Sequence, residues 1–227
     1  MKLALRWLVA GSLALAMQVQ AQPARDSIAE RVKACAACHG KQGEGLTKAE
    51  YYPRLAGKPA GYLFNQLVAF RDARRGSPIM NYLVAHLGDD YLLEIARYYE
   101  ALKPAYPPPV PAPQDVLARG RELATRGDPA RKLPACVSCH GERLSGVQPA
   151  IPGLVGLSGH YVASQMGAWR IGLRRAAEPD CMREIASALS VEDTAAISAF
   201  LATLPASPEQ GAAPAGSTQL PMKCGSR

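Results

Sequence analysis

The sequence has few aromatic residues and no second long hydrophobic run. Only 6% of its 227 residues are aromatic, including three Phe and two Trp, so its cores lack the bulky rings that usually fill small domains. After residue 20 no apolar run reaches the ~20 residues of a membrane span. No alternation of apolar and polar residues is convincing enough to predict strands. The composition, 48% hydrophobic and 20% charged, is that of a folded, soluble protein, and the lack of strand patterns together with the helical periodicity described below predicts an all-α class.

The first 21 residues resemble a secretory signal. Lys2 and Arg6 precede an apolar stretch over residues 7–17, and Val19-Gln20-Ala21 follows as a small-x-small cleavage site. A retained membrane anchor is the alternative, although this apolar stretch is shorter than a span. We expect a mature chain that starts at Gln22 in the periplasm, where disulfides are permitted.

Basic residues outnumber acidic ones by 26 to 19, and removal of residues 1–21 leaves an excess of five positive charges. This excess favours an acidic partner surface. Nucleic acid is not an expected partner of an exported protein, whereas peripheral membrane association stays open.

The chain repeats itself. "CAACHG" at residues 35–40 returns as "CVSCHG" at residues 136–141, and similar residues continue beyond both motifs. The matched positions at an offset of 99 are Pro53, Leu55, Gly57, Tyr62, Gln66, Ala69 and Arg71 with Pro152, Leu154, Gly156, Tyr161, Gln165, Ala168 and Arg170. At an offset of 102 they are Met80, Leu87, Ile95 and Leu102 with Met182, Leu189, Ile197 and Leu204. Matches over such a length predict two homologous domains.

We expect an N-terminal domain over residues 22–102 and a C-terminal domain over 115–205. The linker, residues 103–114, has six prolines in twelve residues. It is either a semi-rigid polyproline spacer or a segment strapped along both domains. The tail, residues 206–227, is rich in Ala, Gly, Pro and Ser and is predicted to be flexible.

Helical periodicity recurs in each half. Apolar residues at three- and four-residue spacing mark helices within 61–76, 89–102 and 190–204. Asp89 is a candidate N-cap, and Ser190 with Asp193 resembles a capping box.

The CxxCH motif has three readings. A structural zinc site needs four ligands, and each domain offers three locally. A thioredoxin-type dithiol needs a βαβ context that is absent here. The third reading is covalent haem c, in which the two thiols reach the two vinyl groups and the adjacent His binds iron. Two copies in matched helical domains predict two covalently bound haem c groups, at Cys35, Cys38 and His39 and at Cys136, Cys139 and His140.

A second axial ligand is expected for each iron. Met80 follows His39 by 41 residues, Met182 follows His140 by 42, and both hold the same repeat position. They are therefore the predicted thioether ligands, although core filling would also explain them, and His86 is a weaker rival at the first haem. A thioether favours ferrous iron and so raises the reduction potential.

These motifs resemble class I cytochromes c and, through the duplication, the di-haem cytochrome c4 type. In that family the Pro of a Pro-x-Leu-x-Gly motif accepts a hydrogen bond from the axial His, which the resemblance assigns to Pro53 and Pro152. The resemblance implies two tandem class I cytochrome c domains, each wrapped around one haem. The linker, Cys181 and the tail depart from the family pattern.

Two features have more than one interpretation. Cys181 and Cys224 form a disulfide, stay free or bridge to another chain, or else Cys181 binds iron as a thiolate, as in some di-haem thiosulfate dehydrogenases. The repeated arginines form solvated helix faces paired with haem propionates, or a docking surface for an acidic redox partner. These arginines are Arg71, Arg74 and Arg75, and Arg170, Arg174 and Arg175.

The sequence therefore predicts an electron carrier of the respiratory chain, not an enzyme. The expected donor is a quinol-oxidising complex or a dehydrogenase, and the acceptor is a terminal oxidase or reductase. The alternative is a di-haem enzyme, a thiosulfate dehydrogenase or a peroxidase, with a catalytic second haem. A third possibility is an electron-transfer subunit of a larger oxidoreductase.

Overall fold

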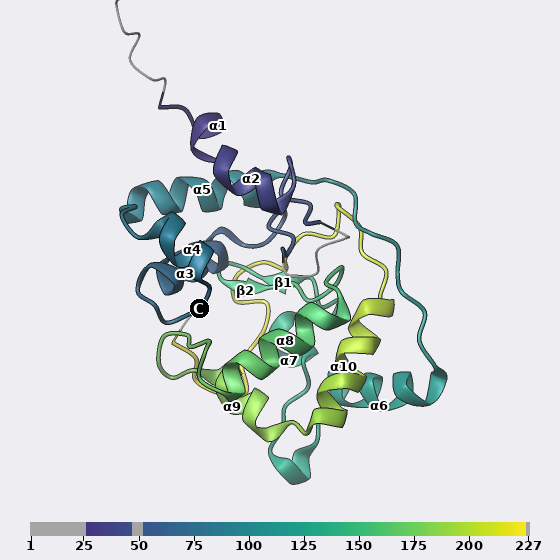
Figure 1. Cartoon of the computed structure of the whole chain (residues 1–227). Coiled ribbons are helices and arrows are strands. Elements are labelled where there is room, and N and C mark those ends of the chain that lie inside the picture. The colour runs from purple at the N-terminus through teal and green to yellow at the C-terminus, as the bar shows by residue number, and fades with distance from the viewer. Residues whose placement is uncertain (1–25, 47–51, 226–227) are drawn as a thin grey trace, which may run out of the picture.

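The computed structural model describes residues 26–46 and 52–225, so the predicted signal at residues 1–21 lies outside the described residues. Two helical halves lie one above the other in Figure 1. The first half consists of α1 (Ile28–Arg31), α2 (Lys33–His39), α3 (Ala60–Arg71), α4 (Pro78–Val84) and α5 (Asp89–Ala101). Its core joins Val32 to residues of α3 and α5.

The second half repeats this pattern with additions. Its helices are α6 (Gln114–Thr125), the 3₁₀ turn η1 (Pro129–Arg131), α7 (Val137–His140), α8 (Gly159–Arg170), α9 (Cys181–Ala188) and α10 (Val191–Thr203). Two short strands, β1 (Gly146–Val147) and β2 (Ile151–Pro152), pair in antiparallel fashion, with Gly146 opposite Pro152. The all-α class is confirmed, with this one small ladder added.

Local signals explain where several helices begin. The Ser190 side chain accepts a hydrogen bond from Asp193 N, and the Asp193 carboxylate accepts one from Ser190 N, so the predicted capping box is present. At α5 the N-cap is Gly88 and not Asp89. Asp89 lies in the first turn instead, where a carboxylate interacts favourably with the helix dipole.

The repeated arginines are not simply solvated. Arg75 and Arg174 are buried and form an antiparallel bridge between the two halves. Arg75 donates to Gln66, Tyr161 and Gln165. Arg174 donates to Gln165, Tyr62 and Gln66. The same three repeat positions from each half therefore build a symmetric interface, which corrects the expectation of a solvated face for this pair.

The linker is strapped along the surface. Its carbonyls at Pro104 and Ala105 accept hydrogen bonds from the buried Arg54, whose guanidinium lies 3.7 Å from the centre of the Tyr106 ring. Gly156 has φ +71°, and a Cβ there would lie 2.2 Å from Tyr106. Tyr106 thus packs against the Pro-x-Leu-x-Gly motif of the second half while its own segment is held by the first.

The tail forms backbone hydrogen bonds with the second half. Ala213 pairs in parallel with Val147, accepting from Gln148 N and donating to Gly146 O, both at 2.8 Å. Further along, Gly225 N donates to Pro179 O at 3.0 Å. Hydrogen bonds near both ends of residues 213–225 therefore connect this segment to the second half, and the yellow part of Figure 1 shows its path.

Within the part of the chain that the structure describes, no single helix is long and apolar enough to cross a membrane. The consecutive helices α9 and α10 pass such a test only when taken together, and they are bent by 113°.

Candidate functional site

The clearest candidate site lies in the second half. Cys139 and His140 end the short helix α7, while Met182 lies in the first turn of α9. Cys136, Cys139, His140 and Met182 line one apolar cavity together. A second cavity shares Cys139, His140 and Met182 and extends toward the interface between the halves. The four predicted residues of the second site are thus brought together although 46 positions separate the first from the last.

The hydrogen bond of His140 Nδ1 leaves the other ring nitrogen, Nε2, to bind a metal. Its Nδ1 lies 2.8 Å from the carbonyl oxygen of Pro152. A carbonyl only accepts, so Nδ1 carries the proton and Nε2 presents its lone pair. Burial lowers the pKa of the His140 imidazole, which keeps it neutral at physiological pH. A neutral imidazole with a fixed tautomer is the form that ligates iron.

The first half repeats this arrangement. His39 ends α2, is buried, and has its Nδ1 2.8 Å from Pro53 O. Burial is again the largest influence on its pKa, which it lowers. Tyr52 packs edge-on against the ring, with 6.3 Å between the ring centroids. The two histidines and the two prolines therefore have matching geometry at both candidate sites.

Met80 lies in a different apolar cluster from Cys35. Cys35 packs against the core that contains Val32 and Leu63. Met80 packs against Phe70, Val84 and Leu92, and the side chains of Phe64 and Leu67 of α3 contact both clusters. The structure thus places Cys35 and Met80 in adjoining apolar clusters. By contrast, the four predicted residues of the second site line one cavity.

The geometry does not support the zinc alternative. Across residues 26–46 and 52–225, no three His, Cys, Asp or Glu side chains are grouped so that they could hold a metal ion. Burial raises the pKa of Cys136 to about 11 and also raises that of Cys139. Both side chains are therefore thiols when nothing is bound to them.

The residues around the second cavity fit a haem, which is an apolar ring with two carboxylates. Lys58 and Arg174 line this cavity, and Arg75 shares the acceptors Gln66 and Gln165 with Arg174. All three cations are buried, and among the described residues no carboxylate is within ion-pair distance of any of them. Buried cations without a counter-ion are costly. Trp169 Nε1 is also buried without an acceptor, and it lines the same cavity as Arg174 and Lys58. Haem carboxylates would supply the missing negative charges and acceptor.

The pKa values of Lys58 and Tyr62 are both shifted at this buried interface. Burial lowers the pKa of Lys58 to about 8, although its Nζ donates to Gly153 O at 2.9 Å. Burial acts to raise the pKa of Tyr62, but Arg174, Arg75 and Lys58 together outweigh it and lower the value to about 8. The first shift reflects burial, and the second reflects the positive charges that face Tyr62 at the interface.

Sequence reasoning missed the buried cluster of this site. The cluster could have been suspected from Tyr62, Gln66 and their counterparts, which are polar positions matched between the halves. Met222 lines the cavity beside His140 and Met182, and the signal for its return is the disulfide between Cys181 and Cys224, one of the alternatives that the sequence offered. His86 is exposed on the loop before α5.

A scan against models of protein families found no match. Among curated proteins, a thiosulfate dehydrogenase electron acceptor of Thiomonas intermedia is 38% identical over 179 residues, which cover 78% of this chain and 82% of that protein. Cytochrome c4 of Pseudomonas aeruginosa is 34% identical over 198 residues, which cover 86% of this chain and 96% of that protein.

A solved structure extends the likeness to the fold. Reduced recombinant cytochrome c4 from Pseudomonas stutzeri superposes with a TM-score of 0.70 at 28% identity, covering 78% of this chain and 97% of that one. The predicted fold class and cofactors are thereby confirmed. With its repeated CxxCH motifs, matched His–Pro pairs and tandem helical halves, the chain belongs to the cytochrome c4 family of electron carriers, which bind two covalent haem c groups.

Proposed function

We propose that each half holds one haem through the residues of its repeat. Cys35 and Cys38 attach the first haem, with His39 and Met80 on its iron. Cys136 and Cys139 attach the second, with His140 and Met182 on its iron. The observation that carries this proposal is that Cys136, Cys139, His140 and Met182 line one cavity. Pro53 and Pro152 fix the histidine tautomers.

With these ligands the chain carries electrons and has no catalytic step of its own. Haem c supplies reversible one-electron chemistry. His and Met side chains from the protein would hold each iron, which would leave no position for a substrate. The surroundings of Met182 and Met80 are largely apolar, and low polarity together with a thioether would raise the reduction potential.

The enzyme alternative needs a different sixth ligand on the second haem. The thiolate that would serve is that of Cys181, but this residue forms a disulfide with Cys224. Met182 lines the cavity next to it. This arrangement favours an electron carrier over a di-haem thiosulfate dehydrogenase or peroxidase.

The ligands can be tested by replacing each methionine separately. We expect Met80→Ala and Met182→Ala each to abolish one of two strongly shifted methionine methyl signals in the NMR spectrum of the reduced protein. Each variant should also become able to bind carbon monoxide at one haem only. Met222→Leu is the matched control, because Met222 lines the same cavity but is not a proposed ligand. Loss of a signal in Met222→Leu, or its survival in Met182→Ala, would contradict the assignment.

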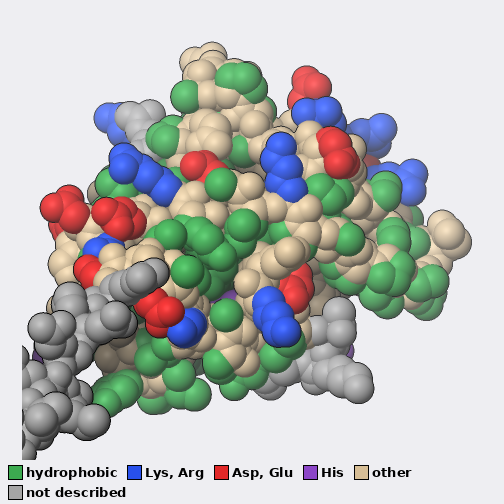
Figure 2. Space-filling view, turned by 90° about the horizontal axis from the view of Figure 1, so that it is seen from above, with side chains coloured by type: hydrophobic (Ala, Val, Ile, Leu, Met, Phe, Trp, Pro, Cys, Tyr) green, Lys and Arg blue, Asp and Glu red, His purple; other side chains and the backbone are tan. Residues whose placement is uncertain are grey.

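For the partners, we propose a periplasmic carrier that accepts electrons from a dehydrogenase of the thiosulfate-oxidising class and passes them to a terminal oxidase or reductase. The names of two relatives, at 38% and 36% identity, support this donor. On the face shown in Figure 2, basic and acidic side chains alternate around a group of apolar ones. Such a mixed surface favours a brief encounter that depends only weakly on salt.

The donor can be tested by stopped-flow reduction of the oxidised protein. We expect a purified thiosulfate dehydrogenase with thiosulfate to reduce both haems at a rate that rises with dehydrogenase concentration. Thiosulfate alone should give no reduction, and a quinol-oxidising complex with quinol serves as the competing donor. Faster reduction by the quinol-oxidising complex would overturn this choice of donor and leave the assignment of a carrier intact.

A further inference from the structure

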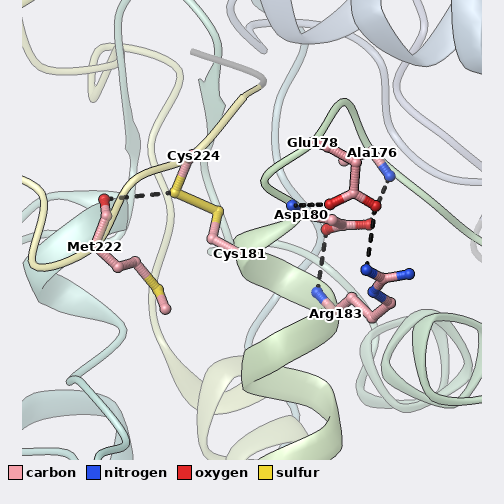
Figure 3. Close-up of a disulfide and its surroundings, with 7 residues drawn as sticks. All are labelled: Ala176, Glu178, Asp180, Cys181, Arg183, Met222 and Cys224. Atoms are coloured by element: carbon pink, nitrogen blue, oxygen red, sulfur yellow. Dashed lines mark hydrogen bonds and ion pairs between the residues drawn. A yellow bond between two sulfur atoms is a disulfide. The ribbon is translucent and has the colours of Figure 1, made fainter.

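The two halves differ at the residue before the proposed methionine ligand. In the first half this residue is Ile79, which is 57% exposed. At the matching position of the second half, Cys181 forms a disulfide with Cys224, 43 residues later in the tail (Figure 3). The repeat itself therefore does not require this crosslink, since the first half has none.

The crosslink holds the start of α9 from one side. Cys181 is the first residue of that helix, and Met182 is the next. From the other side, the buried Asp180 caps the helix, accepting hydrogen bonds from Arg183 N at 3.1 Å and Ala176 N at 2.7 Å. The turn that carries Met182 is thus fixed by a cap and by a covalent bond.

The tail lies tightly against the loop before α9. Gly225 N donates to Pro179 O, and a Cβ at Gly225 would lie 2.3 Å from Glu178 O. Only glycine permits this approach of two backbones. The other anchor of the tail is the pairing of Ala213 with Val147.

Between these anchors the tail forms part of the wall of the second cavity. Leu220, Met222 and Cys224 line it together with His140 and Met182. The tail side chains are apolar, and none of them is a ligand in the proposed assignment. Their position is that of a cover over the second site.

We propose that residues 213–225 form a disulfide-anchored cover, in which the Cys181–Cys224 bond positions Met182 and the tail keeps small ligands away from the second haem. The proposal rests on Met182 as the iron ligand. Cys181, Cys224 and the tail are positioning elements, since they act through Met182 and through the access of ligands to the cavity. The residue before Met80 is Ile79 and cannot form such a crosslink, so the first haem serves as a control inside the same molecule.

The test compares the double variant Cys181→Ser/Cys224→Ser with the wild type, both carrying two haems. We expect cyanide to bind the second haem at least about tenfold faster in the variant, because ligand entry needs a local opening that the crosslink keeps rare. The methionine methyl signal of the second haem should broaden or vanish, and both properties of the first haem should not change. Gln219→Ala, an exposed tail substitution, should behave like the wild type.

A second variant separates the covering of the cavity by the tail from the positioning of Met182 by the disulfide. Leu220→Ala/Met222→Ala keeps the disulfide but removes the side chains that line the cavity, so faster cyanide binding is expected with the methionine signal intact. The proposal is overturned if both double variants keep wild-type cyanide rates and signals. A wild type without two methionine signals would instead overturn the ligand assignment, so the two failures are distinguishable.

Discussion

At the scale of single residues, Asp193 joins three parts of the second half. Its carboxylate caps α10 and forms ion pairs with Arg119 at 2.8 Å and Arg131 at 2.7 Å, while its side chain is only 7% exposed. Burial acts to raise the pKa of Asp193, but the hydrogen bonds from Arg131 and Arg119 outweigh it, and the pKa is lowered. A carboxyl group whose pKa is lower in the folded than in the unfolded state stabilises the fold at pH values above its unfolded-state pKa. This stability is lost as the pH falls through the folded-state pKa.

We therefore expect Asp193→Asn to reduce the free energy of unfolding near neutral pH by about 1–3 kcal/mol, since a cap and two charged partners lose their acceptor. The difference from the wild type should shrink below pH 4, where the wild-type carboxylate itself becomes protonated. Denaturant unfolding followed by circular dichroism across pH 3–7 measures this, with the exposed Glu142→Gln as the control. A difference that stays constant with pH would count against the ionic role of Asp193.

At the scale of elements, the packing of α6 against α10 depends on a glycine. A Cβ at Gly120 would lie 2.1 Å from Ala196 O and 2.7 Å from Phe200 Cβ. The helices therefore approach each other more closely than any side chain at this position permits. This contact closes the second core, which contains Leu123 of α6 and Ile197 and Leu201 of α10.

We expect Gly120→Ala to destabilise the second half by about 1–3 kcal/mol, because the added methyl group forces the helices apart. Gly167→Ala is the matched control, since Gly167 is also inside a helix but has nothing within 4 Å of its Cβ position. That control should be neutral or slightly stabilising, because Ala is a better helix former. Thermal unfolding of both variants measures this difference in stability. Equal changes in the two unfolding temperatures would show that the contact between α6 and α10 does not limit the stability of the second half.

At the scale of the whole molecule, Arg75 and Arg174 connect the halves. Arg174 reaches Gln165 of its own half and Tyr62 and Gln66 of the other, and its guanidinium stacks 3.7 Å from the centre of a Trp169 ring. Lysine would keep the charge but cannot reproduce this planar fork of donors.

We expect Arg174→Lys to weaken the interface by about 1–3 kcal/mol, since buried acceptors lose their donors. In calorimetry we expect the halves of this variant to unfold in two separate transitions and those of the wild type to unfold in one. The exposed Arg175→Lys is the control, because Arg175 contacts the other half through its backbone N–H, which donates to Arg74 O and is not changed by the substitution. A single unshifted transition in Arg174→Lys would show that other contacts hold the halves together.

The sequence was sufficient for the features that repeat. Two CxxCH motifs, matched methionines and helical periodicity predict the family, the fold class and the cofactors, because each is a local pattern found twice. The positions of Arg75 and Tyr106 could not be predicted in this way. Whether an arginine is solvated or buried, and whether a proline-rich segment is a spacer or a strap, depends on contacts between distant parts of the chain that leave no periodic signal. For the tail, the pair of cysteines outside the haem motifs gave one signal, because a disulfide between Cys181 and Cys224 was one of the alternatives that the sequence offered.

The strap formed by the linker has a kinetic consequence. Arg54 of the first half holds the carbonyls of Pro104 and Ala105, and Tyr106 fills the space left by Gly156 in the second half. Rotation of one half against the other would require this ring to leave its place. We therefore expect a fixed separation between the two redox centres, without sampling by domain motion, and electron exchange within the molecule should not slow down as solvent viscosity rises.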